Sequence, residues 1–249
     1  MNCSQEKVQE MQDDLINIPR TKRGRMTLNN ILSAAIQVFY EKGYHSASIN
    51  DITSLAGVAS GTFYVYFDSK YNLYKYLLFQ CSHKIRKFLS QATSGCKTRL
   101  EVERVGLKAW LEFIMENQYM YHIIWESMYI DYSLFVQYYE TFCAAYKRGL
   151  EKSKAAGELG DIDTEVLAYI LMGITNFLGL NWCLFKRDPS AIDHVVDEFM
   201  KILEGNVFKP EPDQQLRYKE QAEHSVPPKS RFRFEIEVDD DEGEEEDGA

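Results

Sequence analysis

The sequence predicts an all-α protein of 249 residues with two helical modules and a polar C-terminal tail. Apolar residues recur at spacings of three and four along most of the chain, which is the pattern of an amphipathic helix. The alternating pattern of a β-strand is almost absent before residue 230. Hydrophobic residues make up 45% of the chain and only six residues are proline, so the composition is that of a globular protein.

The first predicted helix has a continuous apolar stripe along one face. That stripe consists of Ile31, Ala34, Ala35, Val38 and Phe39. Thr27 or Asn29 is placed to cap the start of this helix, and Gly43 is placed to end it. The helix is therefore expected to bury one face in a small core.

Two short helices joined by a glycine follow the first helix. Ser48 has a carboxylate three residues later, which is the spacing of a capping box at the start of a helix over residues 49–56. Gly57 would end that helix in a left-handed conformation. The second short helix is expected over residues 60–67, with Ser60 as its cap. The three helices predict a helix-turn-helix domain.

The remaining helical pattern predicts a larger C-terminal domain. Its helices are expected over residues 70–93, 99–117, 119–130, 132–157, 163–187 and 189–204. Asp163 and Asp188 stand at N-cap positions. No apolar run is expected to reach the roughly 18 residues that a membrane-spanning helix needs. Prolines after Phe208 indicate a linker.

The net charge of −10 is unevenly distributed. Residues 235–249 contain ten acidic residues and no lysine or arginine, so this tail accounts for the whole net charge. Residues 20–87 contain ten basic and three acidic residues, a net charge of +7. This asymmetry indicates a polyanionic partner for the N-terminal module.

Several classes of protein are not expected. The five cysteines are odd in number and widely spaced, which indicates free thiols in a reducing cytosol and no metal site or disulfide framework. Neither a glycine-rich phosphate loop nor a metalloprotease or nucleophile-elbow motif occurs. We therefore expect no enzyme activity, no cofactor and no metal.

The second short helix has the residue types of a helix that enters a major groove. Its outward positions are small or able to form hydrogen bonds, namely Ser60, Thr62, Tyr64 and Tyr66. Its inward positions, Phe63 and Phe67, are core anchors. Gly61 permits close approach to a phosphate backbone.

Spaced motifs over residues 27–80 are similar to the DNA-binding domain of TetR-family transcriptional repressors. They are A-x-x-x-F from Ala35, G-Y at Gly43, A-G-V at Ala56, G-T-F-Y-x-Y-F from Gly61 and S-K-x-x-L from Ser69. The family has a helical ligand-binding domain whose last two long helices pair with a second subunit. Asn50 stands where a basic residue is common in the family.

The resemblance implies DNA contacts for individual residues. Ser60, Thr62 and Tyr64 would face bases or nearby phosphates, with Gly61 close to the backbone. Tyr66, Lys70 and Ser48 would hold phosphates, and Asn50 would bond a base or a phosphate. Ser48 and Ser60 are equally suited to be helix caps only. The alternative for Tyr64 and Tyr66 is that they pack on the surface.

Basic residues also precede the first helix. Arg23 and Arg25 belong to the basic segment Arg20–Arg25 at the end of a flexible arm over residues 1–24, and this segment would reach a minor groove or phosphates. A disordered, solubilising segment would have the same composition. The other domain boundaries are residues 25–72 for the helix-turn-helix domain, 73–208 for the ligand-binding and dimerisation domain, and 209–249 for a linker and a disordered acidic tail.

The C-terminal domain is rich in aromatic residues between Phe113 and Tyr146. Aromatic side chains line adaptable apolar pockets, although they also form ordinary cores. The ligand-binding candidates are Trp125, Tyr129, Tyr121, Phe142, Tyr146, Asn176 and Phe177. His122 and Glu126 are further candidate polar contacts. The expected ligand is a small apolar or amphipathic molecule.

A twofold axis is expected because two recognition helices read half-sites one DNA turn apart. The helices over residues 163–187 and 189–204 are the candidate dimer helices, although a core within one chain has the same composition. The leading hypothesis is a ligand-responsive, homodimeric repressor of palindromic double-stranded DNA, cytoplasmic and nucleoid-associated, without membrane contact. The alternative is a protein-interaction module that uses the tail or the aromatic surface. The tail would either solubilise the chain or compete with DNA for the basic module.

Overall fold

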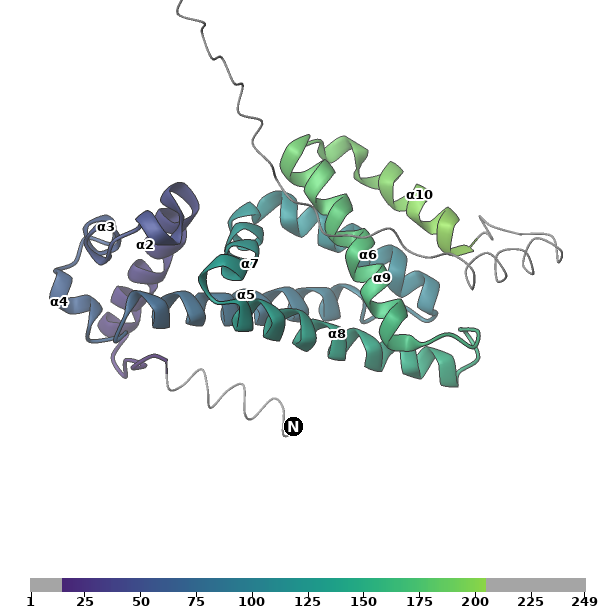
Figure 1. The fold of residues 1–249 in the computed structure, drawn as a ribbon, viewed down its shortest axis with the longest axis horizontal. Coiled ribbons are helices and arrows are strands. Elements are labelled where there is room, and N and C mark those ends of the chain that lie inside the picture. Colours follow the sequence, from purple (N-terminus) through teal and green to yellow (C-terminus); the bar gives the residue numbers. More distant parts are fainter. Residues whose placement is uncertain (1–14, 205–249) are drawn as a thin grey trace, which may run out of the picture. The chain divides into compact units, whose positions relative to one another are not determined.

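The computed structural model describes residues 15–204, and within this range the chain is helical and has no strand (Figure 1). Most of the expectations for the N-terminal arm, and those for the linker and acidic tail over residues 209–249, lie outside the described residues. The predicted all-α class, with an N-terminal helix-turn-helix domain followed by a larger helical domain, is confirmed.

The first described helix, α2 (Lys22–Ser46), begins several residues before the predicted start. Its N-cap is Thr21, whose hydroxyl accepts the Gly24 N–H at 3.1 Å, and neither Thr27 nor Asn29 caps it. No proline interrupts the basic segment, so the helix extends through it. Arg23 and Arg25 therefore lie in the first turns of α2 and not in a flexible arm.

Gly43 interrupts α2 as predicted, with φ 74° and ψ 160°. This φ lies in the region that glycine adopts without a steric penalty. A Cβ atom on Gly43 would also lie 3.1 Å from a carboxylate oxygen of Glu126, so both conformation and space favour glycine there. The break directs the chain toward α3 (Ile49–Leu55).

The helix-turn-helix is built from α3 and α4 (Ser60–Phe63), which are separated by Gly57 at φ 70°. The predicted second helix over residues 60–67 is shorter than expected, because the segment after Phe63 continues as tight turns. Its N-cap is Ala59, so the expectation that Ser60 caps this helix is wrong. Phe63 and Phe67 are fully buried, as predicted.

A long helix, α5 (Lys70–Ala92), connects the two domains, and it packs against α2, α6, α7 and α8. The predicted boundary at residue 72 falls in its first turn. Because α5 belongs to both cores, buried residues of both domains form one continuous hydrophobic cluster.

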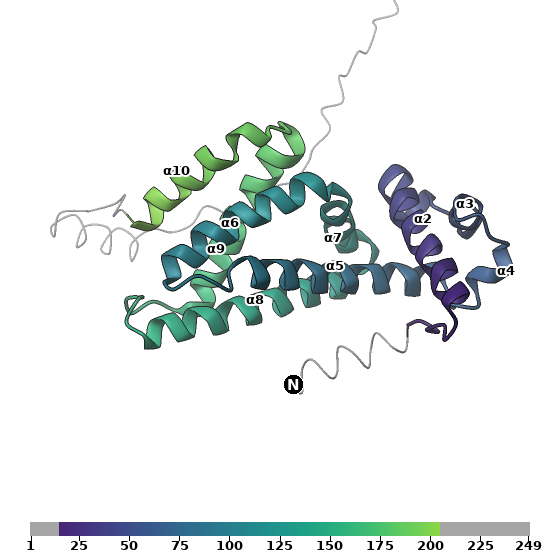
Figure 2. The same ribbon diagram turned by 180° about the vertical axis from the view of Figure 1, so that it is seen from behind.

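The C-terminal domain follows the predicted helices closely. It contains α6 (Arg99–Glu116), α7 (Gln118–Ile130), α8 (Tyr132–Ala155), α9 (Thr164–Leu178) and α10 (Ile192–Glu204). Figures 1 and 2 show α5 beside α8 and α6 beside α10. Ion pairs from Arg104 to Asp197 at 2.6 Å and from Lys108 to Asp193 at 2.5 Å hold α10 on α6.

The predicted helix over residues 163–187 changes character part-way. Asp163 caps α9 by accepting the N–H groups of Glu165 and Val166 at 2.8 and 3.0 Å, as predicted. From Gly179 the chain continues as a π-helix to Phe185, and a single 3-10 turn (Pro189–Ala191) precedes α10. The apolar periodicity located the segment but not its helix type.

Thr164–Phe185 corrects the expectation about membrane spans. This segment is long and apolar enough to cross a bilayer by length and composition alone, and 28% of its most apolar window is buried. It packs against α8 and α6 through buried Ala168, Leu171 and Cys183. Apolar helices that pack inside proteins can have the same length and composition.

Candidate nucleic-acid interface and ligand cavity

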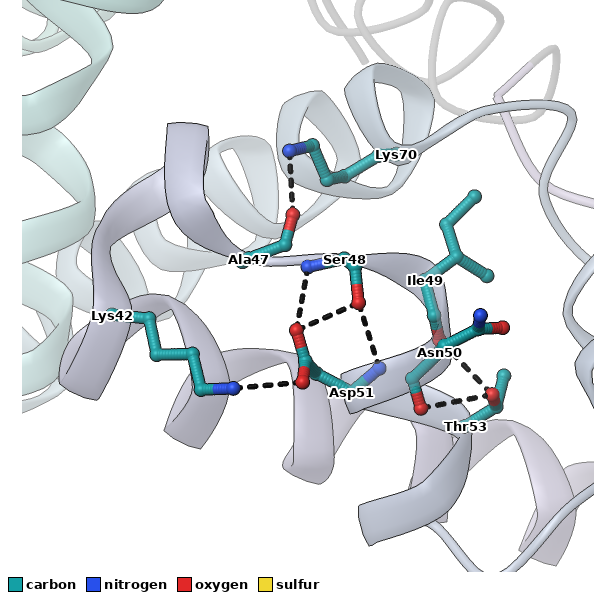
Figure 3. A network of polar contacts seen from close by, with 8 residues as sticks. All are labelled: Lys42, Ala47, Ser48, Ile49, Asn50, Asp51, Thr53 and Lys70. Carbon is teal, nitrogen blue, oxygen red and sulfur yellow. Dashed lines mark hydrogen bonds and ion pairs between the residues drawn. The ribbon is translucent and has the colours of Figure 1, made fainter.

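A capping network fixes the start of α3 (Figure 3). The Asp51 N–H donates to the Ser48 hydroxyl at 3.0 Å, and the Asp51 carboxylate accepts the Ser48 N–H at 2.9 Å. Lys42 from α2 donates to the same carboxylate at 2.7 Å. The hydrogen bonds from Lys42 and then Ser48 hold the pKa of Asp51 well below its usual range. Ser48 is therefore a helix cap, and a phosphate contact there remains a prediction.

Lys70 holds the corner between α2 and α3. Its Nζ donates to the carbonyl oxygens of Tyr44 and Ala47, each at 2.6 Å, and lies 4.4 Å from the centre of the Tyr44 ring. Desolvation lowers the pKa of Lys70, and the nearby Glu126 carboxylate acts in the opposite direction. Since two of its three N–H bonds are used inside the domain, Lys70 positions the α2–α3 corner, and its predicted phosphate contact has one donor left.

Asn50 and Ser60 connect the two short helices. The Ser60 hydroxyl donates to the Asn50 side-chain oxygen at 2.6 Å, and both residues are exposed. The Thr53 hydroxyl bonds back to the Ile49 carbonyl at 3.0 Å and stays buried. Two side chains predicted to contact DNA therefore lie side by side on the surface and bond each other.

The outer face of α4 is open to solvent. Ser60 and Gly61 are exposed, Thr62 is half-buried, and the Tyr64 side chain is 55% exposed. A Cβ atom on Gly61 would meet no heavy atom within 4 Å. Val65 is also exposed and was missed by sequence reasoning, because valine resembles a core residue.

Tyr66 corrects the predicted outward face. It is buried, and its hydroxyl donates to the Gly24 carbonyl in α2 at 3.1 Å. The chain leaves helical geometry after Phe63, and this turns Tyr66 inward. Arg23 and Arg25 are both exposed, and the Arg25 guanidinium donates to the Arg20 carbonyl at 3.0 Å.

A cavity of about 800 Å³ lies in the C-terminal domain between α5, α6, α8 and α9. Of the predicted ligand-binding residues, Phe142, Tyr146 and Asn176 line it. Its apolar wall includes Leu89, Val102, Leu107, Trp110 and Met172. Cavities of this size hold drug-sized or lipid-sized molecules.

A buried ion pair forms part of the cavity wall. Arg99 and Glu103, with side chains 9% and 7% exposed, pair through the Arg99 Nε at 2.6 Å from the carboxylate. The Tyr146 hydroxyl also donates to this carboxylate, and the guanidinium lies 4.9 Å from the centre of the Tyr146 ring. Burial and the Glu103 charge raise the pKa of Tyr146 well above its usual value. A Cβ atom on Gly149 would lie 2.9 Å from the Arg99 guanidinium, so a larger residue at that position would displace the guanidinium.

Cations outnumber carboxylates around the cavity. Arg86, Lys97, Arg99 and Lys152 line it, whereas Glu103 is the one acidic residue in its wall. Lys97 and Lys152 are exposed, so they border the opening, and burial lowers the pKa of Arg86. The Trp110 Nε1 is buried and has no hydrogen-bond partner among the described residues.

The other predicted ligand-binding residues lie outside the cavity. Tyr129 and Phe177 are 77% and 70% exposed, so they point into solvent. Tyr121 and Trp125 stack on each other behind the wall, with ring centres 6.1 Å apart. Helical periodicity could not tell which residues of the aromatic segment face the cavity, the core or solvent. It also did not indicate that Trp110, Arg99 and Glu103 line the cavity.

His122 and Glu126 also lie away from the cavity. Glu126 instead accepts the backbone N–H of Tyr44 at 2.6 Å, in the helix-turn-helix domain. The His122 ring packs on the Tyr40 ring, with ring centres 5.7 Å apart. Neither side chain is therefore placed to contact a ligand in the cavity.

Residues 31–77 match the family model of bacterial regulatory proteins of the tetR family. The helix-turn-helix domain of this chain belongs to the TetR family. The matched residues contain α3, α4 and most of α2, so they are the helix-turn-helix described above. The family consists of regulators, not of enzymes.

Curated and structural relatives agree with this assignment. The chain is 29% identical over 113 residues to the HTH-type transcriptional activator FasR of Mycolicibacterium smegmatis, and the match covers 45% of this chain and 50% of FasR. Its matches to this and two other curated regulators span about half or less of the length of those proteins.

Two solved structures share the fold. One is the fatty acid degradation regulator FadR from Bacillus halodurans, with a TM-score of 0.62 and 21% identity; the match covers 74% of this chain and 97% of that one. The other is FadR from Bacillus subtilis in complex with stearoyl-CoA, with a TM-score of 0.59 and 16% identity; the match covers 73% of this chain and 100% of that one.

Proposed function

We propose that this TetR-family chain is a dimeric DNA-binding transcriptional repressor that a small amphipathic molecule releases from its operator. The observation that carries the proposal is the exposed face of α4 and its C-cap, on which Ser60, Gly61 and Tyr64 are open to solvent. The capping network at Ser48 fixes the start of α3, and the Lys70 bonds fix the corner between α2 and α3. Such a chain would act in the cytoplasm and be associated with the nucleoid.

The operator is obtained by selecting bound sequences from a random DNA pool. We expect one palindromic site, a Kd at least about 1,000-fold below that for random DNA, and a steep dependence of affinity on salt. Weak binding without sequence preference would contradict the repressor proposal and favour a protein-interaction module. The spacing of the two half-sites would also indicate whether a twofold-symmetric dimer binds the operator.

Replacing Tyr64 with alanine is expected to weaken operator binding about 10-fold or more, since a good base or backbone contact contributes roughly 1–3 kcal/mol. Fluorescence anisotropy with the selected operator measures this loss. The matched control is Tyr132→Ala, which changes a 68% exposed tyrosine on α8. Equal affinities of the two variants would exclude Tyr64 from the DNA contact.

The ligand is proposed to occupy the 800 Å³ cavity with its anionic group near Lys97 and Lys152. The excess of cations around the opening supports an anion, and the apolar wall supports a long acyl chain. The names of the two solved structures, a fatty acid degradation regulator and a complex with stearoyl-CoA, support the same chemistry.

Stearoyl-CoA is therefore expected to bind the protein and to lower its operator affinity. The double variant Lys97→Glu/Lys152→Glu is expected to weaken stearoyl-CoA binding about 10-fold, because it replaces attraction with repulsion. Isothermal titration calorimetry measures this change. The control is Lys201→Glu on α10, away from the opening and 67% exposed. If the double variant binds stearoyl-CoA with unchanged affinity, the anionic group of the ligand does not bind at this end of the cavity.

Dimerisation is proposed to use the exposed side of α9. Its apolar residues Val166, Tyr169, Ile170 and Phe177 are 46–70% exposed, and a Cβ atom on Gly173 on the same side would meet nothing within 4 Å. By contrast, α10 buries its apolar face on α6 of its own chain. The open face supports α9 as the larger part of the proposed interface.

A further inference from the structure

Glu126 joins the C-terminal domain to the helix-turn-helix domain. It lies on α7, and its Oε1 accepts the backbone N–H of Tyr44 at 2.6 Å. Tyr44 directly follows the break in α2, and the missing side chain of Gly43 leaves the room that the carboxylate occupies. A carboxylate on one domain therefore holds a main-chain corner of the other.

The same corner is held from its other side by Lys70. Glu126 binds the N–H of Tyr44, whereas Lys70 binds the carbonyl oxygens of Tyr44 and Ala47 at 2.6 Å. Ala47 immediately precedes Ser48, the N-cap of α3. A displacement of Glu126 would thus move the chain that leads into α3, the first helix of the helix-turn-helix.

The opposite end of α7 touches the cavity wall. The Tyr121 hydroxyl donates to the Asn176 carbonyl at 2.8 Å, and its ring centre lies 6.2 Å from that of Trp110. Asn176 and Trp110 both line the cavity, and the buried Trp110 Nε1 has no hydrogen-bond partner within residues 15–204. A ligand that offers an acceptor to Trp110 would change the packing against which Tyr121 rests.

Two atoms near the corner have no hydrogen-bond partner in the part of the chain that the structure describes. They are the second oxygen of Glu126 and the Nδ1 of His122, which are buried and lie 3.8 Å apart. Buried polar atoms normally find partners. His122 is therefore the nearest group for the Glu126 carboxylate to pair with when its side chain leaves the Tyr44 N–H, and this gives Glu126 the two alternative positions that a two-state coupling element requires.

We propose that Glu126 is the positioning residue that couples the cavity to the DNA-binding face, with α7 as a rigid connection between Tyr121 and Tyr44. Glu126 follows Tyr121 by five positions, which is a rise of about 7.5 Å along the helix, so a shift of the cavity wall is transmitted without unfolding. This inference rests on the proposed control of DNA binding by a cavity ligand.

The test is the ratio of operator Kd values with and without saturating stearoyl-CoA. Allosteric ratios are typically about 5–150-fold. In Glu126→Ala we expect this ratio to fall to about 2 or less, while stearoyl-CoA binding to the protein alone changes little. Glu126→Gln is expected to retain part of the ratio, because its amide oxygen still accepts the Tyr44 N–H. The matched control, Glu116→Ala, removes an exposed glutamate on α6.

A merely structural role would lower the melting temperature or the operator affinity and leave the ratio unchanged, which would overturn the inference. If Glu126→Ala fails to fold, Tyr121→Phe removes the bond to Asn176 at the other end of α7. This variant is expected to lower the ratio as well, and an unchanged ratio there also overturns the inference. A ratio of 1 in the unmodified protein would instead overturn ligand control itself.

Discussion

A Glu103→Ala variant is expected to lose about 3–5 kcal/mol of unfolding free energy, because it leaves the Arg99 guanidinium charged and unpaired in the interior. Tyr146 would lose its acceptor at the same time. Urea unfolding followed by tryptophan fluorescence measures the loss. The control is Glu112→Ala on the same helix, where the side chain is 52% exposed and the expected change is within about 0.5 kcal/mol.

The double variant Arg99→Met/Glu103→Leu separates the cost of an unpaired charge from the value of the pair. Buried pairs replaced by apolar residues of similar volume are often neutral or stabilising. We therefore expect the double variant to be at least about 2 kcal/mol more stable than Glu103→Ala. A single variant as stable as the control would show that water reaches Arg99, contrary to its burial in the structure.

An Ile170→Glu variant is expected to weaken operator binding about 100-fold or more, because two linked recognition helices exceed the affinity of one by roughly 10²–10⁴. Ile170 lies in the middle of the exposed side of α9 and is 49% exposed. A buried carboxylate there would prevent the proposed dimer. Sedimentation equilibrium measures the subunit association, and anisotropy measures the operator affinity.

The matched control for the dimer is Tyr132→Glu, which adds the same charge at an exposed aromatic position on α8. It is expected to remain dimeric with unchanged operator affinity. If the Ile170→Glu protein stays dimeric, the dimer interface lies on another face of the molecule. A monomeric protein with full operator affinity would contradict the requirement for two recognition helices.

Local sequence rules predicted those parts of the fold that depend on near neighbours. The Ser48 capping box, the left-handed Gly57 and the Asp163 cap each require only residues within four positions, and the structure contains all three. The start of α2 was missed because Thr21 and Thr27 both have suitable side chains, and the basic residues between them also form a good helix.

The site depends on contacts across the fold, which local patterns do not contain. Tyr66 alternates with Tyr64 in the sequence as an outward residue, yet its hydroxyl bonds Gly24, which is 42 positions away. Trp110 faces the cavity, whereas Phe177 faces solvent, and both have the pattern of core residues. Periodicity gives the face of a helix but not what lies opposite it.

The hydrogen bond between Ser60 and Asn50 bears on how the protein would search a genome. Without DNA, the two side chains satisfy each other at 2.6 Å. A matching base or phosphate has to replace this bond, whereas a mismatched sequence leaves it intact and leaves neither group desolvated and unpaired. Discrimination at this position would then arise from an exchange of partners, which lets the protein leave wrong sites quickly and dwell only where the exchange is favourable.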